Sequence, residues 1–484
     1  MRHAPVALRE RGRLAALFHT VLRQARRQPG WQEPDRRTTR TWRQVVLGVL
    51  VTHSTRLVTV SQAVLGQRAA QSVKAVAMGL AYFLTVADFP AATLSPQVLE
   101  ATARQLDPAQ VATYRGKAVL AIDPTDYPKR SRGRGRSKDG TARPMEHIGR
   151  VRTRQTGSKT TTRTRRTVAA KPAPAAKPAP AAKPAPAAKP APRVATTTGY
   201  VDVWAGVVLT GKQFFPLARQ LFSNAHPDLT SQNRVEEAVL AAALARLEHL
   251  GWAAIVVADR GLGRKELLVT LVTQGRDLDI RVDPDITVYT TAHPDGALLA
   301  DVLAAQPAGG EVLWDRGQEG TLRCQAHTVT ATIRFSRSGR QADYQEATLN
   351  FVQLVPCDGP TDPLVLATTL PTETLADIKG VVRVYSFRWA VETGFETMKG
   401  WGLGRFMVRK WQAIDRLLWT VAVAYALLVV AVRDGPLAIL RAQAVALLNR
   451  WAVLGRRLTV GKLAEAIGLD HQRHRRAWAT VWLT

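Results

Sequence analysis

The stretch "WAAIVVAD", residues 252–259, is a short apolar run that ends in an aspartate. Its length and its β-branched residues predict a buried strand. The preceding segment, "SQNRVEEAVLAAALARLEHL" (231–250), spaces its apolar residues as an amphipathic helix does and opens on Ser231, a residue type favoured at helix starts. A helix that leads directly into a buried strand indicates an α/β arrangement.

Strands are also predicted on the N-terminal side of this helix. "KAVLAID" (117–123) is a second apolar run that ends in an aspartate. "TGYVDVWAGVVLTGKQFFPLARQLF" (198–222) alternates apolar and polar residues and contains a turn signal at Thr210-Gly211, which predicts a hairpin. Two or three antiparallel strands, a helix and a further strand predict a mixed α/β core.

The chain of 484 residues has room for several domains, and 46% hydrophobic residues is typical of a folded protein. Residues 1–112 are predicted to form a helical N-terminal domain. It could bind DNA or serve as a basic scaffold, and the choice stays open because no recognition-helix signature stands out. The remaining predicted parts are a first core part (113–286), a β-rich insertion (287–360), a second core part (361–432) and a basic helical C-terminal region that could contact DNA or a second subunit (433–484).

The chain is strongly basic. It holds 67 Lys and Arg against 38 Asp and Glu, a formal net charge of +29, which predicts a polyanionic partner, with nucleic acid as the first candidate. The only cysteines are Cys324 and Cys357, which excludes a disulfide framework and fits a reducing compartment. The N-terminus is interrupted by arginines and does not read as a secretory signal.

More than half of the excess charge lies in one segment, residues 129–193. It carries 19 Lys and Arg against two acidic residues, a net charge of +17. Within it, residues 169–192 are four copies of "AAKPAP", a composition that predicts an extended, exposed basic loop without a core.

One apolar run could be mistaken for a membrane span. Residues 417–432 contain 16 uncharged residues, fewer than the roughly 20 that cross a bilayer. We therefore predict a buried helix here and no membrane partner.

The segment "YSFRWAVETGFETMK", residues 385–399, combines polar and apolar periodicity. At about 100° per residue, five of its polar side chains would lie within roughly 80° of one another on a single helix. These are Tyr385, Arg388, Glu392, Glu396 and Lys399. A neighbouring stripe that can pack inward consists of Phe387, Val391, Phe395 and Met398.

Three acidic residues are candidates for a metal site. Asp123 and Asp259 each end a predicted buried strand, and Glu392 lies on the polar helix face. Three carboxylates delivered in this way could hold two divalent ions, Mg²⁺ or Mn²⁺, as in phosphoryl transfer. Taken singly, each acid reads as an ordinary strand end or solvated helix residue. Arg388 and Lys399 lie on the same helix stripe as Glu392, and cations that can bind a phosphate there favour a metal site for phosphoryl transfer. Asp126 is close enough to Asp123 to be an alternative ligand.

The spacing Tyr, two residues, Arg, three residues, Glu, six residues, Lys in "YSFRWAVETGFETMK" resembles the signature of the IS4-type DDE transposases. "VLAIDPTDYPK" resembles the first-aspartate strand of that family and "VVADRGLGRKELL" the second-aspartate strand. "LDIRVDPD" resembles the strand that follows. The likeness covers residues from about 117 to 430.

The resemblance implies an RNase H-like core in which Asp123, Asp259 and Glu392 bind two Mg²⁺ or Mn²⁺ ions. It also implies that Tyr385, Arg388 and Lys399 contact DNA phosphates. The expected activity is cleavage at transposon ends followed by transfer of the free 3′-OH into target DNA. The expected partners are double-stranded DNA and, in the end complex, a second copy of the chain. The expected location is the cytoplasm of a prokaryote, at the nucleoid.

Two other functions stay open on the residues alone. The same carboxylates would serve a metal-dependent nuclease without strand transfer. A DNA-binding protein descended from a transposase would use the basic tracts, although an anionic cluster facing phosphates would not help binding.

We predict that deletion of residues 169–192 leaves the core folded, since halving a loop changes the closure free energy by roughly 0.6 kcal/mol. If the four repeat lysines neutralise duplex phosphates, the deletion should flatten the plot of log binding constant against log salt by at most about 3.6 units. Binding titrations across a salt series measure this slope, and an unchanged slope would mean that the repeat is an inert spacer.

Overall fold

The computed structural model describes residues 8–64, 72–129, 145–152, 196–229, 231–317, 320–340, 343–358, 362–433 and 467. The "AAKPAP" repeats and almost all of the predicted C-terminal region lie outside these residues. The N-terminal part consists of helices followed by a short 3₁₀ helix and a short strand. These elements are α1 (Leu8–Ala25), α2 (Arg36–Thr52), α3 (Leu57–Val64), α4 (Val73–Thr85), α5 (Ala91–Ala103), η2 (Pro108–Gln110) and β1 (Thr113–Tyr114).

The next part of the chain forms the centre of a large mixed sheet with two helices. Its elements are β2 (Lys117–Pro128), β3 (Gly149–Arg152), β4 (Thr196–Leu209), β5 (Gln213–Phe222), α6 (Gln232–His249), β6 (Ala254–Ala258), η3 (Arg260–Leu262), α7 (Lys265–Thr273) and β7 (Asp277–Arg281). The predicted hairpin is confirmed by the antiparallel pairing of β4 with β5, and positive φ angles at Gly211 and Lys212 make the turn.

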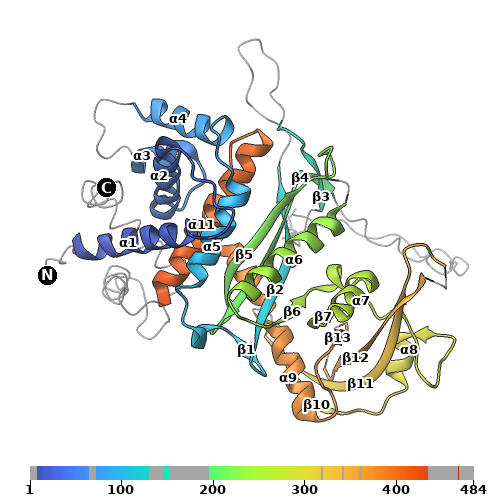
Figure 1. The fold of residues 1–484 in the computed structure, drawn as a ribbon. Helices are drawn as coiled ribbons and strands as arrows, with labels where there is room; N and C mark the ends of the chain where they lie inside the picture. The colour runs from blue at the N-terminus through green and yellow to red at the C-terminus, as the bar shows by residue number, and fades with distance from the viewer. Residues whose placement is uncertain are drawn as a thin grey trace, which may run out of the picture.

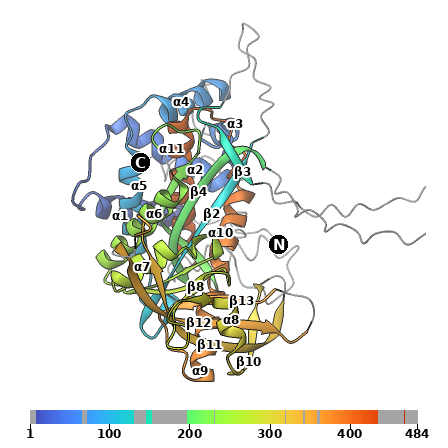
Figure 2. The same ribbon diagram turned by 90° about the vertical axis from the view of Figure 1, so that its right-hand side faces the viewer.

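The chain then adds further strands and helices, and α11 is the last named element in the described residues. These elements are β8 (Thr287–Val288), β9 (Ala297–Leu298), α8 (Leu299–Ala304), β10 (Gly310–Asp315), β11 (Thr321–Phe335), β12 (Gln345–Pro356), β13 (Leu364–Thr368), α9 (Leu375–Ser386), α10 (Trp389–Gly400) and α11 (Trp411–Arg433). Strands β10 to β12 lie at the opposite end of the molecule from helices α2 to α4 (Figures 1 and 2).

The main sheet runs in the order β10-β11-β12-β13-β7-β6-β2-β4-β3, with β5 also paired to β4 and β1 to β2. Among the described strands of this sheet, the β2–β6 and β6–β7 pairs are parallel and the other pairs are antiparallel. The inner order β5-β4-β2-β6-β7 is consistent with an RNase H-like core.

Helix α11 joins the two halves of the molecule. It packs against α5, α2 and α4 on the helical side and against β5 of the sheet (Figure 1). By length and composition alone this 23-residue helix could cross a membrane, but 94% of its most apolar window is buried inside the protein. The expected buried helix at 417–432 is therefore confirmed, within a longer element than its apolar run indicated.

The expectation of one helix through residues 385–399 is wrong. Helix α9 ends at Ser386 and α10 begins at Trp389, so Tyr385 belongs to the first helix and Arg388 to the junction. The N–H of Arg388 donates to the carbonyl of Tyr385 at 3.0 Å, an i to i−3 bond that tightens the turn between the two helices. The segment contains no glycine or proline at this break, so the sequence carried no signal for it.

The inward stripe of the same segment is confirmed. Val391, Phe395 and Met398 are buried, and Phe387 packs against the core while partly exposed. The start of α9 is fixed by a capping box, in which Thr374 and Asp377 each bind the other's backbone N–H.

A fully buried aspartate lies in the middle of the sheet. Asp279 of β7 is flanked by Val257 of β6 and Thr368 of β13. Neither of its carboxyl oxygens has a well-oriented hydrogen-bond partner in the described part of the chain. Burial raises the pKa of Asp279 well above its usual value, and the nearby backbone amide of Tyr385 offsets only part of that effect.

We predict that Asp279→Asn removes a pH-dependent destabilisation. Because the folded-state pKa is raised, the folded protein keeps a proton that the unfolded chain releases, so stability falls as the pH rises above about 4. The free energy of unfolding of Asp279→Asn minus that of wild type should therefore increase by about 1.4 kcal/mol for each unit that the pH rises, until the folded-state pKa is reached. Urea denaturation at pH 5, 6 and 7 checks this, and a difference that stays constant with pH would contradict it.

Candidate active site

Two aspartates lie side by side where a parallel pair of strands stops. The β2–β6 pairing runs from Ala118 and Ala254 to Ile122 and Ala258, and the next residue on each strand is an aspartate. Asp259 directly follows the last residue of β6, close to the expected strand end. The expectation that Asp123 also ends its strand is wrong, because β2 continues to Pro128 through its antiparallel pairing with β4. The pairing of β2 with β6 stops just before Asp123. Beyond that point, β6 no longer covers this edge of β2.

Helix α10 brings Glu392 to this position. The helix packs on β5 and β2, and Gly394 allows its close approach, since a Cβ there would lie 3.0 Å from the Phe214 ring. Glu392 stands in the first turn of α10, and the Phe395 ring packs edge-on against Trp204 of the sheet. The buried stripe of α10 therefore fixes the direction in which its acidic face points.

A cavity of about 510 Å³ opens between β2 and α10. Its charged lining residues are Asp123, Asp126, Glu392, Glu396, Lys399 and Arg405. Asp123, Glu392 and Lys399 were expected together and share this cavity. Asp126, the rival to Asp123, lines it as well. Arg405 is a basic wall residue that sequence reasoning missed.

Asp259 lies at the neighbouring strand end and is not among the residues that line this cavity. Its side chain is 41% exposed, and its Oδ1 lies 3.8 Å from a guanidinium nitrogen of Arg281 on β7. The Tyr385 hydroxyl donates to the same oxygen over a long 3.5 Å contact. Sequence reasoning missed Arg281, although a cation at the end of the strand next to β6 was a usable signal.

Arg388 lies among the acidic groups. Its side chain is 6% exposed, and its Nη1 donates to Oε1 of Glu392 at 2.7 Å. Burial alone would lower the pKa of Arg388, but attraction to Tyr385, Asp259, Glu392 and Asp123 raises it above the usual value. The guanidinium therefore stays charged and interacts with all three predicted carboxylates.

Tyr385 is buried beneath the same cluster. Burial raises the pKa of its phenol above the usual range, while the positive charge of Arg388 opposes that shift. The hydroxyl is therefore protonated at neutral pH and available as a hydrogen-bond donor toward Asp259.

Lys129 holds the segment at Gly404, which lines the cavity between β2 and α10. It follows β2, and its ammonium group donates to the carbonyls of Gly404 at 2.6 Å and Phe406 at 3.1 Å while lying over the Phe406 ring. Burial lowers the pKa of Lys129 to about 7. These bonds tie the end of the Asp123 strand to the segment that follows α10.

Carboxylate oxygens suit a hard divalent cation, but these three carboxylates are not gathered into a formed metal site. Among the described residues, no group of three Asp, Glu, His or Cys side chains is placed to hold a metal ion. Asp123 and Asp259 are adjacent in the sheet, while Glu392 is engaged by Arg388. The residues thus fit an Mg²⁺ or Mn²⁺ site by chemistry, provided that Glu392 is released.

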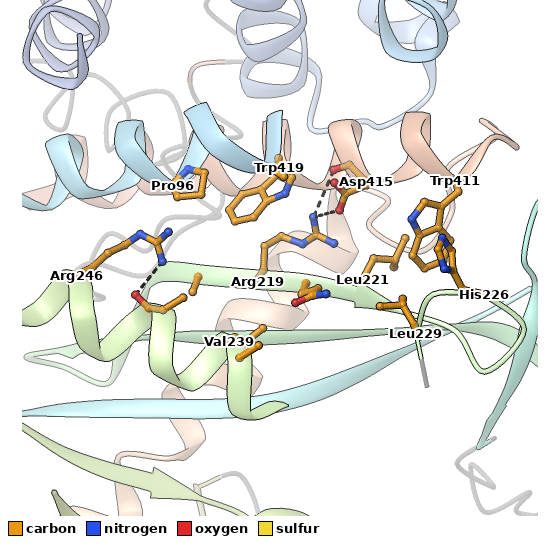
Figure 3. Close-up of a pocket in the computed structure, with 15 residues that line it drawn as sticks. Pro96, Arg219, Leu221, His226, Leu229, Val239, Arg246, Trp411, Asp415 and Trp419 are labelled. Atoms are coloured by element: carbon orange, nitrogen blue, oxygen red, sulfur yellow. Dashed lines mark hydrogen bonds and ion pairs between the residues drawn. The ribbon is translucent and has the colours of Figure 1, made fainter. Parts of the chain in front are cut away.

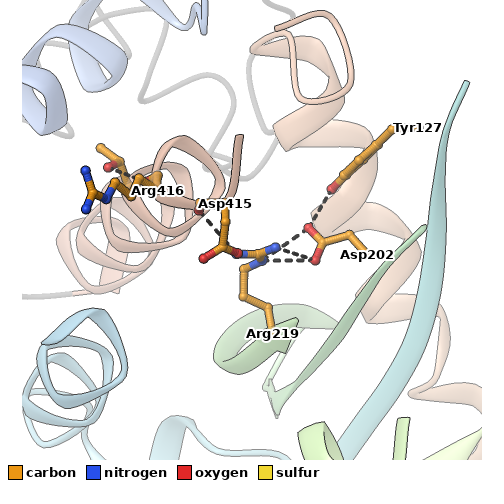
Figure 4. Close-up of polar contacts among 6 residues, drawn as sticks. Tyr127, Asp202, Arg219, Asp415 and Arg416 are labelled. Atoms are coloured by element: carbon orange, nitrogen blue, oxygen red, sulfur yellow. Dashed lines mark hydrogen bonds and ion pairs between the residues drawn. The ribbon is translucent and has the colours of Figure 1, made fainter. Parts of the chain in front are cut away.

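A second cavity, of about 390 Å³, lies between α5, α6, β5 and α11 (Figure 3). Its most deeply buried charge, Arg219, is fully paired. Arg219 donates to Asp202 of β4 at 2.8 Å and to Asp415 of α11 at 2.7 Å, and Tyr127 donates to the same Asp202 (Figure 4). This network satisfies its own members and ties α11 to the sheet, so we read it as structural.

Residues 222–427 match a family model described as a transposase DDE domain. The matched range contains Asp259, Tyr385, Arg388, Glu392 and Lys399 and begins after Asp123. No curated protein matches the chain. The match supports a DDE transposase, an enzyme class that acts on DNA with divalent metal ions.

Proposed function

We propose that the protein is an IS4-type transposase in which Asp123, Asp259 and Glu392 hold two Mg²⁺ or Mn²⁺ ions. The observation that carries the proposal is that Asp123 and Glu392 line one cavity, while Asp259 stands beside Asp123 at the end of the neighbouring strand. Ions bound there would activate water and stabilise the attacking and leaving oxygens of a phosphodiester.

The protein's own side chains would place the DNA. Lys399 lies on the exposed side of α10 in the cavity wall, where an ammonium group can bind a backbone phosphate. Tyr385 donates toward Asp259 and orients that carboxylate. Arg388 and Tyr385 would contact phosphate near the cleaved end once DNA is bound.

In this proposal the protein binds transposon ends, cleaves them and transfers the resulting 3′-OH into target DNA. It acts as a homodimer on paired ends in the cytoplasm of a prokaryote, at the nucleoid. Residues 1–112 and 433–484 would add DNA or subunit contacts.

Incubation with labelled linear DNA that carries candidate ends, with and without Mg²⁺, tests the function. Metal-dependent cleavage followed by joined products supports a transposase. Cleavage without joining would indicate a nuclease, and binding without cleavage would indicate a DNA-binding descendant.

We predict that Asp123→Asn, Asp259→Asn and Glu392→Gln each abolish cleavage, because each removes a proposed metal ligand. DNA binding should remain largely intact, since no basic contact is lost. Gel-shift and cleavage assays on the same DNA measure both properties. Near-normal cleavage by any one variant would remove that residue from the site.

The matched control for this series is Glu396→Gln. Glu396 lines the same cavity one helical turn beyond Glu392, so it has the same charge and a similar setting. This variant should keep much of the activity. Complete loss would mean that the ligand had been placed one turn too early.

We predict that Lys399→Ala lowers cleavage while leaving the melting temperature close to that of wild type. The side chain is exposed, so its removal costs little packing, and its proposed partner is a phosphate. Thermal melting and single-turnover cleavage provide the two measurements. A melting temperature that falls in proportion to the activity would instead assign Lys399 a structural role.

A further inference from the structure

Arg388 occupies an unusual electrostatic position. It is a buried guanidinium attracted by the three carboxylates proposed as metal ligands, and it directly binds Glu392 at 2.7 Å. Asp123 and Asp259 are neighbours in the sheet, and Glu392 lines the same cavity as Asp123, so these carboxylates repel one another unless cations neutralise them. In the absence of metal, Arg388 supplies positive charge at this point.

The contacts of Arg388 leave one of its donors unused. The Nε–H of Arg388 is buried without a hydrogen-bond partner in the described part of the chain. An arginine in its best arrangement binds an anion bidentately through neighbouring N–H groups. The present pairing with Glu392 uses Nη1 and therefore leaves part of the bonding capacity of the guanidinium for another acceptor.

Two aromatic rings pack beside the Arg388 guanidinium, but the Nε–H has no acceptor among the described residues. Its guanidinium carbon lies 4.7 Å from the centre of the Trp389 ring and 5.8 Å from that of Tyr385. The tight turn at the α9–α10 junction places Arg388 at the N-terminal end of α10, one turn before Glu392.

We propose that Arg388 is the counter-ion of the metal-free site and that divalent ions displace it from Glu392. This inference rests on the proposed function, because it takes Asp123, Asp259 and Glu392 as the metal ligands. A metal ion and Arg388 would compete for the same carboxylate charge. Once displaced, the guanidinium could turn its free donor toward a DNA phosphate.

If Arg388 only ordered the site, its loss would weaken metal binding. If it is the counter-ion, its loss should strengthen metal binding. Arg388→Gln should bind Mn²⁺ more tightly than wild type, on the order of tenfold, because a competing positive charge is gone. Arg388→Lys keeps the charge and should bind Mn²⁺ much as wild type does. The metal-free melting temperature of Arg388→Gln should be lower, and its rise on addition of Mn²⁺ should be larger.

Arg405→Gln is the matched control. Arg405 is an exposed cation that lines the same cavity, and its side chain forms no ion pair within the described part of the chain. Its loss changes the net charge by the same amount without freeing Glu392. A similar gain in affinity would mean that general electrostatics, not displacement, explains the effect.

Calorimetric or electron paramagnetic resonance titration of the full-length protein with Mn²⁺ alone gives the affinities. Equal or weaker binding by Arg388→Gln, with wild type binding normally, would overturn the counter-ion role and leave the proposed function intact. No binding by wild type would count against the proposed function itself. If Arg388→Gln is unfolded without metal, Mn²⁺ should restore its circular dichroism, and a failure to do so would overturn the inference.

Discussion

The parallel pairing of β2 with β6 fixes where chemistry can take place. The pairing stops at Ile122 and Ala258, while β2 continues along β4, so the two following aspartates stand together at an open position in the sheet. The strands before this point are buried and apolar, whereas Asp123 and Asp259 are partly exposed where the pairing stops. The position of the site is thus a consequence of strand register.

The third acid and its surroundings depend on this sheet. Helix α10 lies on β5 and β2 because its apolar stripe is buried there, and this packing brings Glu392 toward Asp123. Beside this region, Arg219 links β4 and β5 to α11, which in turn packs against the N-terminal helices. Movement of the helical part relative to the sheet would therefore disturb a buried charge network.

Much of this arrangement could be predicted from the sequence, for identifiable reasons. The buried strand ending at Asp259, the hairpin around Gly211 and the helix at 232–249 follow from local periodicity and turn residues. The continuation of β2 past Asp123 did not, because it depends on pairing with a strand more than seventy residues away. The break before Trp389 also left no trace in the sequence, since no helix-breaking residue stands there.

The electrostatics of the site were the least predictable part. A polar stripe on an ideal helix places Arg388 toward solvent, where it would meet DNA directly. The structure instead buries it against Glu392, and only three-dimensional proximity shows that Asp123 and Asp259 share its charge. For the same reason, the ion contact between Arg281 and Asp259 emerges from strand order and not from a motif.

The most direct test of this account is anomalous diffraction from crystals of the protein grown with Mn²⁺. The account predicts manganese peaks within coordination distance of the carboxylates of Asp123, Asp259 and Glu392, with Arg388 turned away from Glu392. Manganese bound elsewhere, or bound beside the aspartates while Glu392 remains paired with Arg388, would contradict it.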